Sequence, residues 1–329
     1  KLRKMMAFFI LKRLLQSCFV MLAVAFLAFS LFRFVGDPIG QMTGVETSIE
    51  DRERLRADLG LNDPIQVQFT RFTLAMMQGD FGYSYRTRQS VSAMIAKRIP
   101  ATLELGFVAL LVSLIAGIPA GVYTALRPTG LVTQGILLTT LVGVSIPTFV
   151  IGIMLIFLFG VQLGWLPTFG RGGVVQLAGW SSSFFTFDGW RALILPAMTL
   201  GIYQLTLTMR LVRAEMIDVM QSDYIKFATA RGIPYRSLYF RHALSNTMVP
   251  VITVIGLQFG GVIAFSIVTE SVFQWPGLGL LFLESIRFVD IPVMGVYLVL
   301  IAFFFVVINL IVDLLYVAID PRLRLQEEI

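Results

Sequence analysis

Six long apolar stretches restrict this chain to a membrane-spanning fold. A helix needs roughly 20 mainly apolar residues to cross about 30 Å of hydrocarbon, and each stretch reaches that length. The predicted spans are, in chain order, Leu14–Val35, Ala101–Leu126, Val132–Val161 (interrupted at Pro147), Ala192–Leu211, Val249–Phe273 and Pro292–Ile319. We therefore predict an all-α polytopic membrane protein with six transmembrane helices.

The composition agrees with a membrane protein and excludes several classes of site. Of the 329 residues, 57% are hydrophobic and 14% are charged, whereas a soluble domain carries about 25% charged residues. The single cysteine, Cys18, excludes a disulfide within the chain, and the single histidine, His242, excludes a His-rich metal site. In a membrane protein the net charge of +6 reflects topology and contact with membrane lipid, so we expect no binding of nucleic acid.

The distribution of Lys and Arg predicts the orientation in the membrane. With the N-terminus inside, just over half of them lie in cytoplasmic segments, namely the N-terminal tail 1–13, Arg127, Arg210–Arg241 and the C-terminal tail 320–329. Both termini are therefore predicted to be cytoplasmic. The basic start is similar to that of a signal peptide, but the apolar run is too long and lacks a small-residue cleavage site, so we expect a retained helix.

The segment Gly36–Pro100 is predicted to form a small helical cap on the periplasmic side. Glu50–Leu59 is charged and helical in pattern, and Asp63-Pro64 breaks it. Ile65–Met77 is amphipathic, and Gln78-Gly79-Asp80 ends it. The alternative is a solvated loop that packs loosely on its own bundle.

The stretch Asp223–Pro250, DYIKFATARGIPYRSLYFRHALSNTMVP, is a basic interruption in the most apolar half of the chain. Ser222 or Asp223 is expected to cap a short helix, Gly232 to end it in a left-handed conformation, and Pro234 to begin a second helix. The pattern indicates a helix–glycine–helix unit that is contacted from the cytosol. An ordinary juxtamembrane loop that obeys the positive-inside bias fits the spacing equally well.

"DYIKFATARG", followed by "RHALSNTMVPV", resembles the cytoplasmic EAA loop of permease subunits in binding-protein-dependent ABC importers, in the form of the dipeptide/oligopeptide/nickel branch. Lys226, Phe227 and Ala228 stand where Glu-Ala-Ala would, and Gly232 is retained. The resemblance covers nearly the whole chain. It extends to "GDP" at Gly36–Pro38, "LGLNDPIQVQF" at Leu59–Phe69, "GDFGYS" at Gly79–Ser84, "VFQWPGLGLLFLESI" at Val272–Ile286 and the C-terminal "NLIVDLLYVAIDPRLR".

This resemblance implies a type I ABC importer permease fold with an extra periplasmic cap, in a bacterial inner membrane. TM1 (14–35) and the cap (36–100) would precede a five-helix core (101–319) that includes a coupling loop (214–248). The implied partners are a second homologous permease subunit, two cytosolic ABC ATPases and a periplasmic or lipid-anchored substrate-binding protein. ATP and Mg would bind to the ATPases, with no cofactor on this chain. The implied substrates are di- or oligopeptides, and glutathione-like, nickel-chelate or sugar substrates remain open.

The residues that the resemblance assigns to ATPase coupling lie in the basic stretch. They are Tyr224, Lys226, Ala228, Ala230, Arg231, Gly232, Arg236, Arg241 and His242.

The sequence offers no catalytic constellation. It lacks a Gly-x-x-x-x-Gly-Lys-Ser/Thr run, a plausible Ser/His/Asp arrangement and an HExxH motif. We therefore expect no enzymatic activity, and an ATPase on another chain.

Polar residues inside spans are candidates for the translocation path, because charge in hydrocarbon costs several kcal/mol unless it is paired or hydrated. These candidates are Glu104, Gln204, Gln258 and Glu270. The alternative role for them is bonding between helices. The turn Trp275-Pro276-Gly277, ahead of an amphipathic segment, is predicted to form a re-entrant or surface helix near the gate.

A secondary transporter or channel that works without an ATPase is the alternative from a different functional class. Such a protein would need ion-coupling residues inside the membrane and inverted repeats. Six spans with one large external segment and no convincing repeat argue against it.

Overall fold

The computed structural model describes residues 2–34, 48–58 and 60–319. The described residues divide into two compact units, one made of Lys1–Pro100 with Gly277–Val306 and the other of Ala101–Pro276 with Val307–Ile329. The predicted C-terminal tail and the "GDP" stretch lie outside the described residues.

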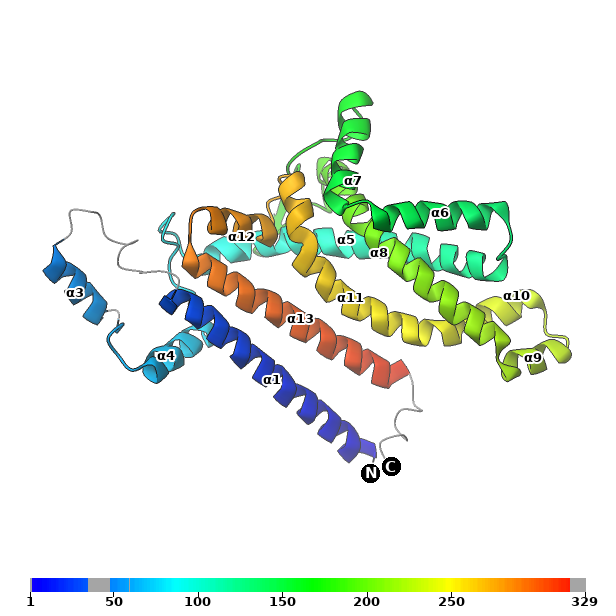
Figure 1. Ribbon diagram of the computed structural model, residues 1–329, viewed down its shortest axis with the longest axis horizontal. Coiled ribbons are helices and arrows are strands. Elements are labelled where there is room, and N and C mark those ends of the chain that lie inside the picture. The colour runs from blue at the N-terminus through cyan, green and yellow to red at the C-terminus, as the bar shows by residue number, and fades with distance from the viewer. Residues whose placement is uncertain (1, 35–47, 59, 320–329) are drawn as a thin grey trace. The chain divides into compact units, whose positions relative to one another are not determined.

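Helices make up most of both units, as the sequence predicts. In chain order they are α1 (Leu2–Phe34), α3 (Ile49–Asp58), α4 (Ile65–Met77), α5 (Val91–Leu126), α6 (Leu131–Ser145), α7 (Thr148–Leu155), the π-helix η1 (Ile156–Gln162), α8 (Phe187–Gln221), α9 (Asp223–Ala230), α10 (Tyr235–Ser237), the π-helix η2 (Leu238–Ala243), α11 (Leu244–Val272), α12 (Leu278–Arg287) and α13 (Ile291–Ile319) (Figure 1). The described part of the chain also holds one antiparallel hairpin that the sequence analysis did not predict, β1 (Val175–Leu177) with β2 (Trp180–Ser182).

Five of the described helices are long and apolar enough to cross a membrane, and the bent pair α6 and α7–η1 makes a sixth if it counts as one span. The bend is 108° and lies at Pro147, where the sequence predicts an interruption. Ile146 is extended, as expected for a residue before proline, and Pro147 is the N-cap of α7, with a φ of −55° and an extended ψ of 138°. Figure 1 shows α7 turning away from α6.

The second span differs from its predicted start. α5 begins at Val91 and runs through Pro100 without interruption, whereas the prediction placed the start of the span after the proline. Val91 and Ile95 are buried, so this first part of α5 has an apolar face that packs within its own unit. A proline removes one backbone donor but does not by itself end a helix that is packed on both sides of it.

In the first unit, α4 packs on α1 through aromatic side chains. Phe26, Phe29 and Phe32 of α1 meet Phe69 and Phe72 of α4, with ring centroids 5.3 to 5.8 Å apart. The bounds of α3 and α4 agree with the two helices predicted between residues 36 and 100. The segment thus contains the two predicted helices, joined by turns at residues 60–64 and followed by a non-helical stretch at 78–90, and α4 packs against α1.

In the second unit, glycines bring α5 and α8 into close contact. A Cβ atom at Gly121 of α5 would lie 2.7 Å from Cβ of Val212, and one at Gly201 of α8 would lie 3.0 Å from the carbonyl oxygen of Ala109. Only glycine permits this approach of the two backbones. α8 also packs along α11, so these three helices form the centre of the unit.

Candidate functional site

The basic segment, Asp223–Ala243, comprises α9, α10 and η2. α9 ends in a Schellman motif, in which the Ile233 amide donates to the Ala228 carbonyl (3.3 Å) and the Gly232 amide donates to the Thr229 carbonyl (2.9 Å). Gly232 has a φ of +75°, a left-handed conformation that glycine adopts without penalty. The helix–glycine–helix geometry follows the sequence prediction, including the start of α10 directly after Pro234.

The predicted side-chain cap of α9 is wrong. Ser222 occupies the N-cap position, but neither its hydroxyl nor the Asp223 carboxylate caps the helix. The Ser222 hydroxyl instead donates back to the Val219 carbonyl (2.5 Å), which also accepts the Ser222 backbone amide (3.1 Å) at the end of α8.

Asp223 forms an exposed ion pair with Lys226 instead of a cap (Oδ1 to Nζ 2.9 Å). The hydrogen bond from Lys226 and its positive charge hold the pKa of the Asp223 carboxyl below its ordinary value of 3.8. The ionised form is therefore favoured. The ion pair is fully present above about pH 3.8, the ordinary pKa of the carboxyl, and is lost as the pH falls through the lowered pKa.

A buried apolar cluster anchors the basic segment to three long helices. Ile225 and Leu238 are only 2% and 1% exposed. The cluster contains Val122 of α5, Val212 and Met216 of α8, Ile225 and Ala228 of α9, Leu238 and Ala243 of η2, and Val251 and Ile255 of α11. The Asn246 amide also donates to the Tyr224 hydroxyl (2.9 Å), which ties α11 to α9. The segment is thus packed and hydrogen-bonded onto the helix ends beneath it.

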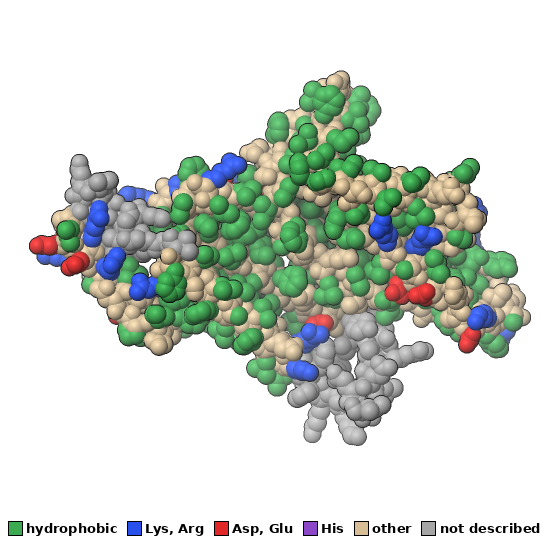
Figure 2. Space-filling view, in the orientation of Figure 1, with side chains coloured by type: hydrophobic (Ala, Val, Ile, Leu, Met, Phe, Trp, Pro, Cys, Tyr) green, Lys and Arg blue, Asp and Glu red, His purple; other side chains and the backbone are tan. Residues whose placement is uncertain are grey.

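The outer face of the basic segment is cationic and aromatic. Of the residues assigned to ATPase coupling, Tyr224, Lys226, Ala230, Arg231, Gly232, Arg236 and Arg241 are exposed, His242 is half-buried, and Ala228 is buried in the cluster. Phe227 is 64% exposed, and Tyr235 and Phe240 are exposed beside it. In Figure 2, basic and acidic side chains are interspersed with hydrophobic ones toward the end of the unit that carries α9. This face presents both charge and apolar area to a partner.

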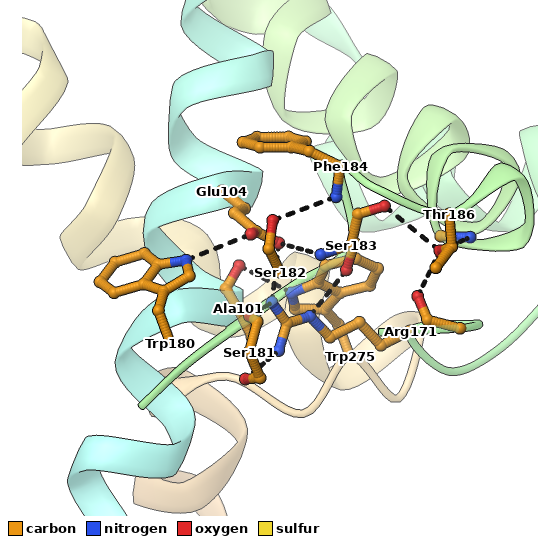
Figure 3. Close-up of polar contacts among 12 residues, drawn as sticks. Ala101, Glu104, Arg171, Trp180, Ser181, Ser182, Ser183, Phe184, Thr186 and Trp275 are labelled. Atoms are coloured by element: carbon orange, nitrogen blue, oxygen red, sulfur yellow. Dashed lines mark hydrogen bonds and ion pairs between the residues drawn. The ribbon is translucent and has the colours of Figure 1, made fainter. Parts of the chain in front are cut away.

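A second group of polar residues lies at the opposite ends of α5 and α11. Glu104 of α5 forms a buried ion pair with Arg171, from Oε2 to Nη2 at 2.7 Å, and both side chains are more than nine-tenths buried. The same carboxylate accepts hydrogen bonds from the Ser183 amide (3.1 Å) and the Trp180 indole (3.4 Å). Figure 3 shows these groups converging on Glu104.

Arg171 is a functional candidate that the sequence analysis missed. Its guanidinium donates to the Ser183 hydroxyl (2.9 Å), the Ser181 hydroxyl (3.1 Å) and the Ser181 carbonyl (2.6 Å), and it lies 5.9 Å from the Trp275 ring centroid. The only signal in the sequence is an isolated arginine among glycines. Its partner Glu104 lies 67 residues earlier, so spacing gives no indication of the pair.

Glu270 and Trp275 join the end of α11 to α5. Glu270 is fully buried and accepts hydrogen bonds from the Thr102 hydroxyl (2.7 Å) and the Ser266 hydroxyl (3.0 Å). The buried Trp275 donates its indole N–H to the Ala101 carbonyl (2.9 Å) and its amide to the Glu270 carbonyl (2.8 Å). Pro276 and Gly277 then form the turn that leads into α12, the helix predicted after it.

Gln204 and Gln258 form an amide pair that joins α8 to α11. All four residues proposed for the translocation path are therefore hydrogen-bonded within the chain, and their role in lining a path stays a prediction. The structure brings Glu104 and Glu270 to the same end of α5 and places the glutamine pair elsewhere. Among the described residues, no group of three or more His, Cys, Asp or Glu side chains is suited to a metal ion.

Sequence comparison assigns almost the whole chain to two family models. Residues 117–325 match the binding-protein-dependent transport system inner membrane component, and residues 5–106 match the N-terminal membrane component of the same kind of system. Among curated relatives, the oligopeptide transport system permease protein AppB of Bacillus subtilis is 40% identical over 97% of this chain and 100% of its own length. The glutathione transport system permease protein GsiC of Salmonella paratyphi A is 36% identical over 96% and 98%.

A solved structure shares the fold. The inward-facing MetNI methionine ABC transporter aligns with a TM-score of 0.54 at 16% identity, over 69% of this chain and 96% of the compared chain. Nearly all of the compared chain is aligned, whereas about a third of this chain is not, so this chain extends beyond the shared fold.

Proposed function

Because the chain belongs to the family of inner membrane components of binding-protein-dependent transport systems, we propose that it forms half of a peptide translocation path. A second, homologous permease subunit completes the path, and a substrate-binding protein delivers the peptide on the periplasmic side. The names of the relatives support this substrate class, since they are oligopeptide, peptide and glutathione permeases. The subunit itself is non-catalytic, and the energy comes from two cytosolic ATPase subunits.

The observation that carries the proposal is the basic segment, with its exposed cationic and aromatic face and its buried apolar anchor. Coupling between two sites requires an element with two alternative positions, and the state of each site must favour one of those positions. The anchor joins α9 and η2 to the ends of α5, α8 and α11, so a displacement of the segment displaces those helices. Arg231, Arg236 and Arg241 supply charge-assisted bonds to an ATPase surface.

Charge reversal on this face tests the contact with the ATPase. The double variant Arg231→Glu with Arg236→Glu is expected to reduce the ATPase that co-purifies with the chain by about tenfold or more, since like charges across an interface cost several kcal/mol. The matched control is Arg54→Glu, a charge reversal on α3. Equal ATPase retention by the double variant and the control would contradict the proposal.

Uptake by the assembled complex tests the mechanism as a whole. Peptide uptake into vesicles that hold both permeases, the ATPases and the binding protein is expected to stop when ATP is removed while the ion gradient is kept. Transport by this chain alone, driven by a gradient, would instead establish the secondary transporter.

A further inference from the structure

A pocket of about 300 Å³ lies within the first unit, between the start of α5 and α12. It is lined by Arg86, Thr87, Gln89, Met94, Lys97, Arg98, Leu281, Glu284, Ser285 and Asp290. Every one of these residues belongs to the same compact unit. The predicted orientation places them on the periplasmic side of the membrane.

The cations of this pocket are not neutralised by carboxylates of the chain. In the described residues, neither Lys97 nor Arg98 has an ion-pair partner, and Arg98 is half-buried. Arg86 has its guanidinium 3.5 Å from the centroid of the Phe288 ring, a cation–π contact that stabilises the cation without adding a negative charge. The pocket therefore has unused capacity to bind an anion.

One of the two carboxylates in the pocket is already committed to the fold. The buried Asp290 accepts hydrogen bonds from the Ser84 hydroxyl and from the Tyr85 amide (3.1 Å). This contact fixes the loop that carries Arg86 against the start of α13. Glu284 is the remaining acidic group, and it partly opposes the three cations.

The helix on the other side of the pocket is also held in place. Phe282 of α12 stacks on Tyr297 of α13, with ring centroids 4.2 Å apart and an interplanar angle of 16°. Both sides of the pocket are thus supported by contacts other than those of the lining groups. A ligand would find the backbone elements that carry the cations already in position, which reduces the ordering cost of binding.

We propose that this pocket binds the free C-terminal carboxylate of a peptide. Lys97 and Arg98 contribute the charge, Gln89 and Thr87 contribute neutral hydrogen-bonding groups, and Met94 and Leu281 contact the apolar part of the last residue. Its volume lies at the lower end of the range for small-molecule sites, so it takes one end of a peptide and not a long chain. The choice of a peptide as the source of the carboxylate rests on the proposed function.

Binding to the full-length chain in phosphatidylcholine nanodiscs tests the site directly. The probe is N-acetyl-trialanine, observed by saturation-transfer NMR, and its C-terminal amide is the matched ligand without a charge. We expect the free acid to bind about tenfold more tightly than the amide. Lys97→Gln and Arg98→Gln should each weaken binding of the acid by a similar factor, whereas Arg287→Gln on α12, outside the pocket, should leave it unchanged.

Glu284→Gln provides a gain-of-binding variant, which misfolding does not produce. Removal of this negative charge should tighten binding of the acetylated acid several-fold, because the probe carries no amine for Glu284 to hold. Equal binding of acid and amide, or no binding of the acid, would overturn the proposal. Loss of the signal in nanodiscs that contain phosphatidylglycerol would overturn it too, by assigning the pocket to a lipid headgroup. ATPase co-purification does not depend on any of these results, so it tests the proposed function independently of the pocket.

Discussion

Two ion pairs in this chain have similar geometry and very different surroundings. Glu104 and Arg171 meet at 2.7 Å with side chains 2% and 8% exposed, and Asp63 and Arg71 meet at 2.8 Å with side chains 39% and 58% exposed. An exposed pair gains little because water screens it. A buried pair leaves an uncompensated charge when one partner is removed.

Removal of one partner should therefore separate the two pairs. Arg171→Met is expected to destabilise the protein by roughly 3 to 5 kcal/mol, and Arg71→Met by less than about 1 kcal/mol. Thermal unfolding in detergent, followed by tryptophan fluorescence, measures both. The double variant Glu104→Gln with Arg171→Met should recover much of the loss, and a double variant as unstable as the single one would contradict the ion-pair explanation.

Single residues were predictable where the chemistry is local. The left-handed Gly232 follows from a glycine and a proline two residues apart. The pairing of Glu104 with Arg171 and of Glu270 with Thr102 was not predictable, since the partners lie 67 and 168 residues away along the chain. The same distance explains why the sequence names these glutamates as path candidates while the structure shows them bonded to Arg171 and Thr102.

The bounds of helices were predicted well wherever the hydrophobic periodicity and the helix-breaking residues agree. α4 has the predicted bounds, and α6 ends beside the predicted break at Pro147. α5 begins ten residues before the predicted span, because the buried Val91 and Ile95 extend the helix through Pro100 on its N-terminal side. The β1–β2 hairpin was missed because three-residue strands carry too little alternation to detect.

A substitution at Gly232, in the turn between α9 and α10, should act through backbone strain and not through steric contact with neighbouring atoms. Gly232 and Gly79 both have a φ of +75°, and a Cβ atom at either would meet nothing within 4 Å. Alanine therefore costs roughly 1 to 2 kcal/mol of backbone strain at each position. We expect Gly232→Ala to lower ATP-coupled uptake and Gly79→Ala to leave it near the wild-type rate. Equal uptake in the two variants would contradict the requirement for a stiff turn in the basic segment.

The two faces of α9 should likewise separate anchoring from binding. Ile225→Ala opens a cavity in the buried cluster and is expected to cost about 2 to 5 kcal/mol of stability. Phe227→Ala removes an exposed ring and should leave thermal unfolding unchanged while it weakens ATPase co-purification. The opposite assignment, with binding lost only in Ile225→Ala, would contradict the surface described for the segment.

For the whole molecule, the number of spans follows from composition and length. Their orientation rests on the distribution of charge, and the 108° bend between α6 and α7 was beyond the sequence. A proline predicts that a helix breaks, but the angle depends on what packs against each half. The same limit applies to the division of the chain into two compact units, which depends on contacts distant in sequence.

Orientation is testable with single cysteines, because Cys18 is the only native one. On a Cys18→Ser background, Tyr235→Cys in α10 should react with an impermeant maleimide only from the cytoplasmic side. Ile49→Cys in α3 should react only from the periplasmic side. Both positions are exposed, so a reversed or equal pattern would refute cytoplasmic termini.

The contacts of Arg171 have a consequence for how this end of α5 can move in the proposed transport cycle. The loop that carries Ser181–Ser183 is tied to two helices, because Arg171 joins it to Glu104 of α5 and lies beside Trp275, which follows α11. Any widening at this end must carry the loop along with α5 as a single block. Solute passage would then depend on whole helices tilting, and its temperature dependence should be that of a large collective movement and not of a local loop.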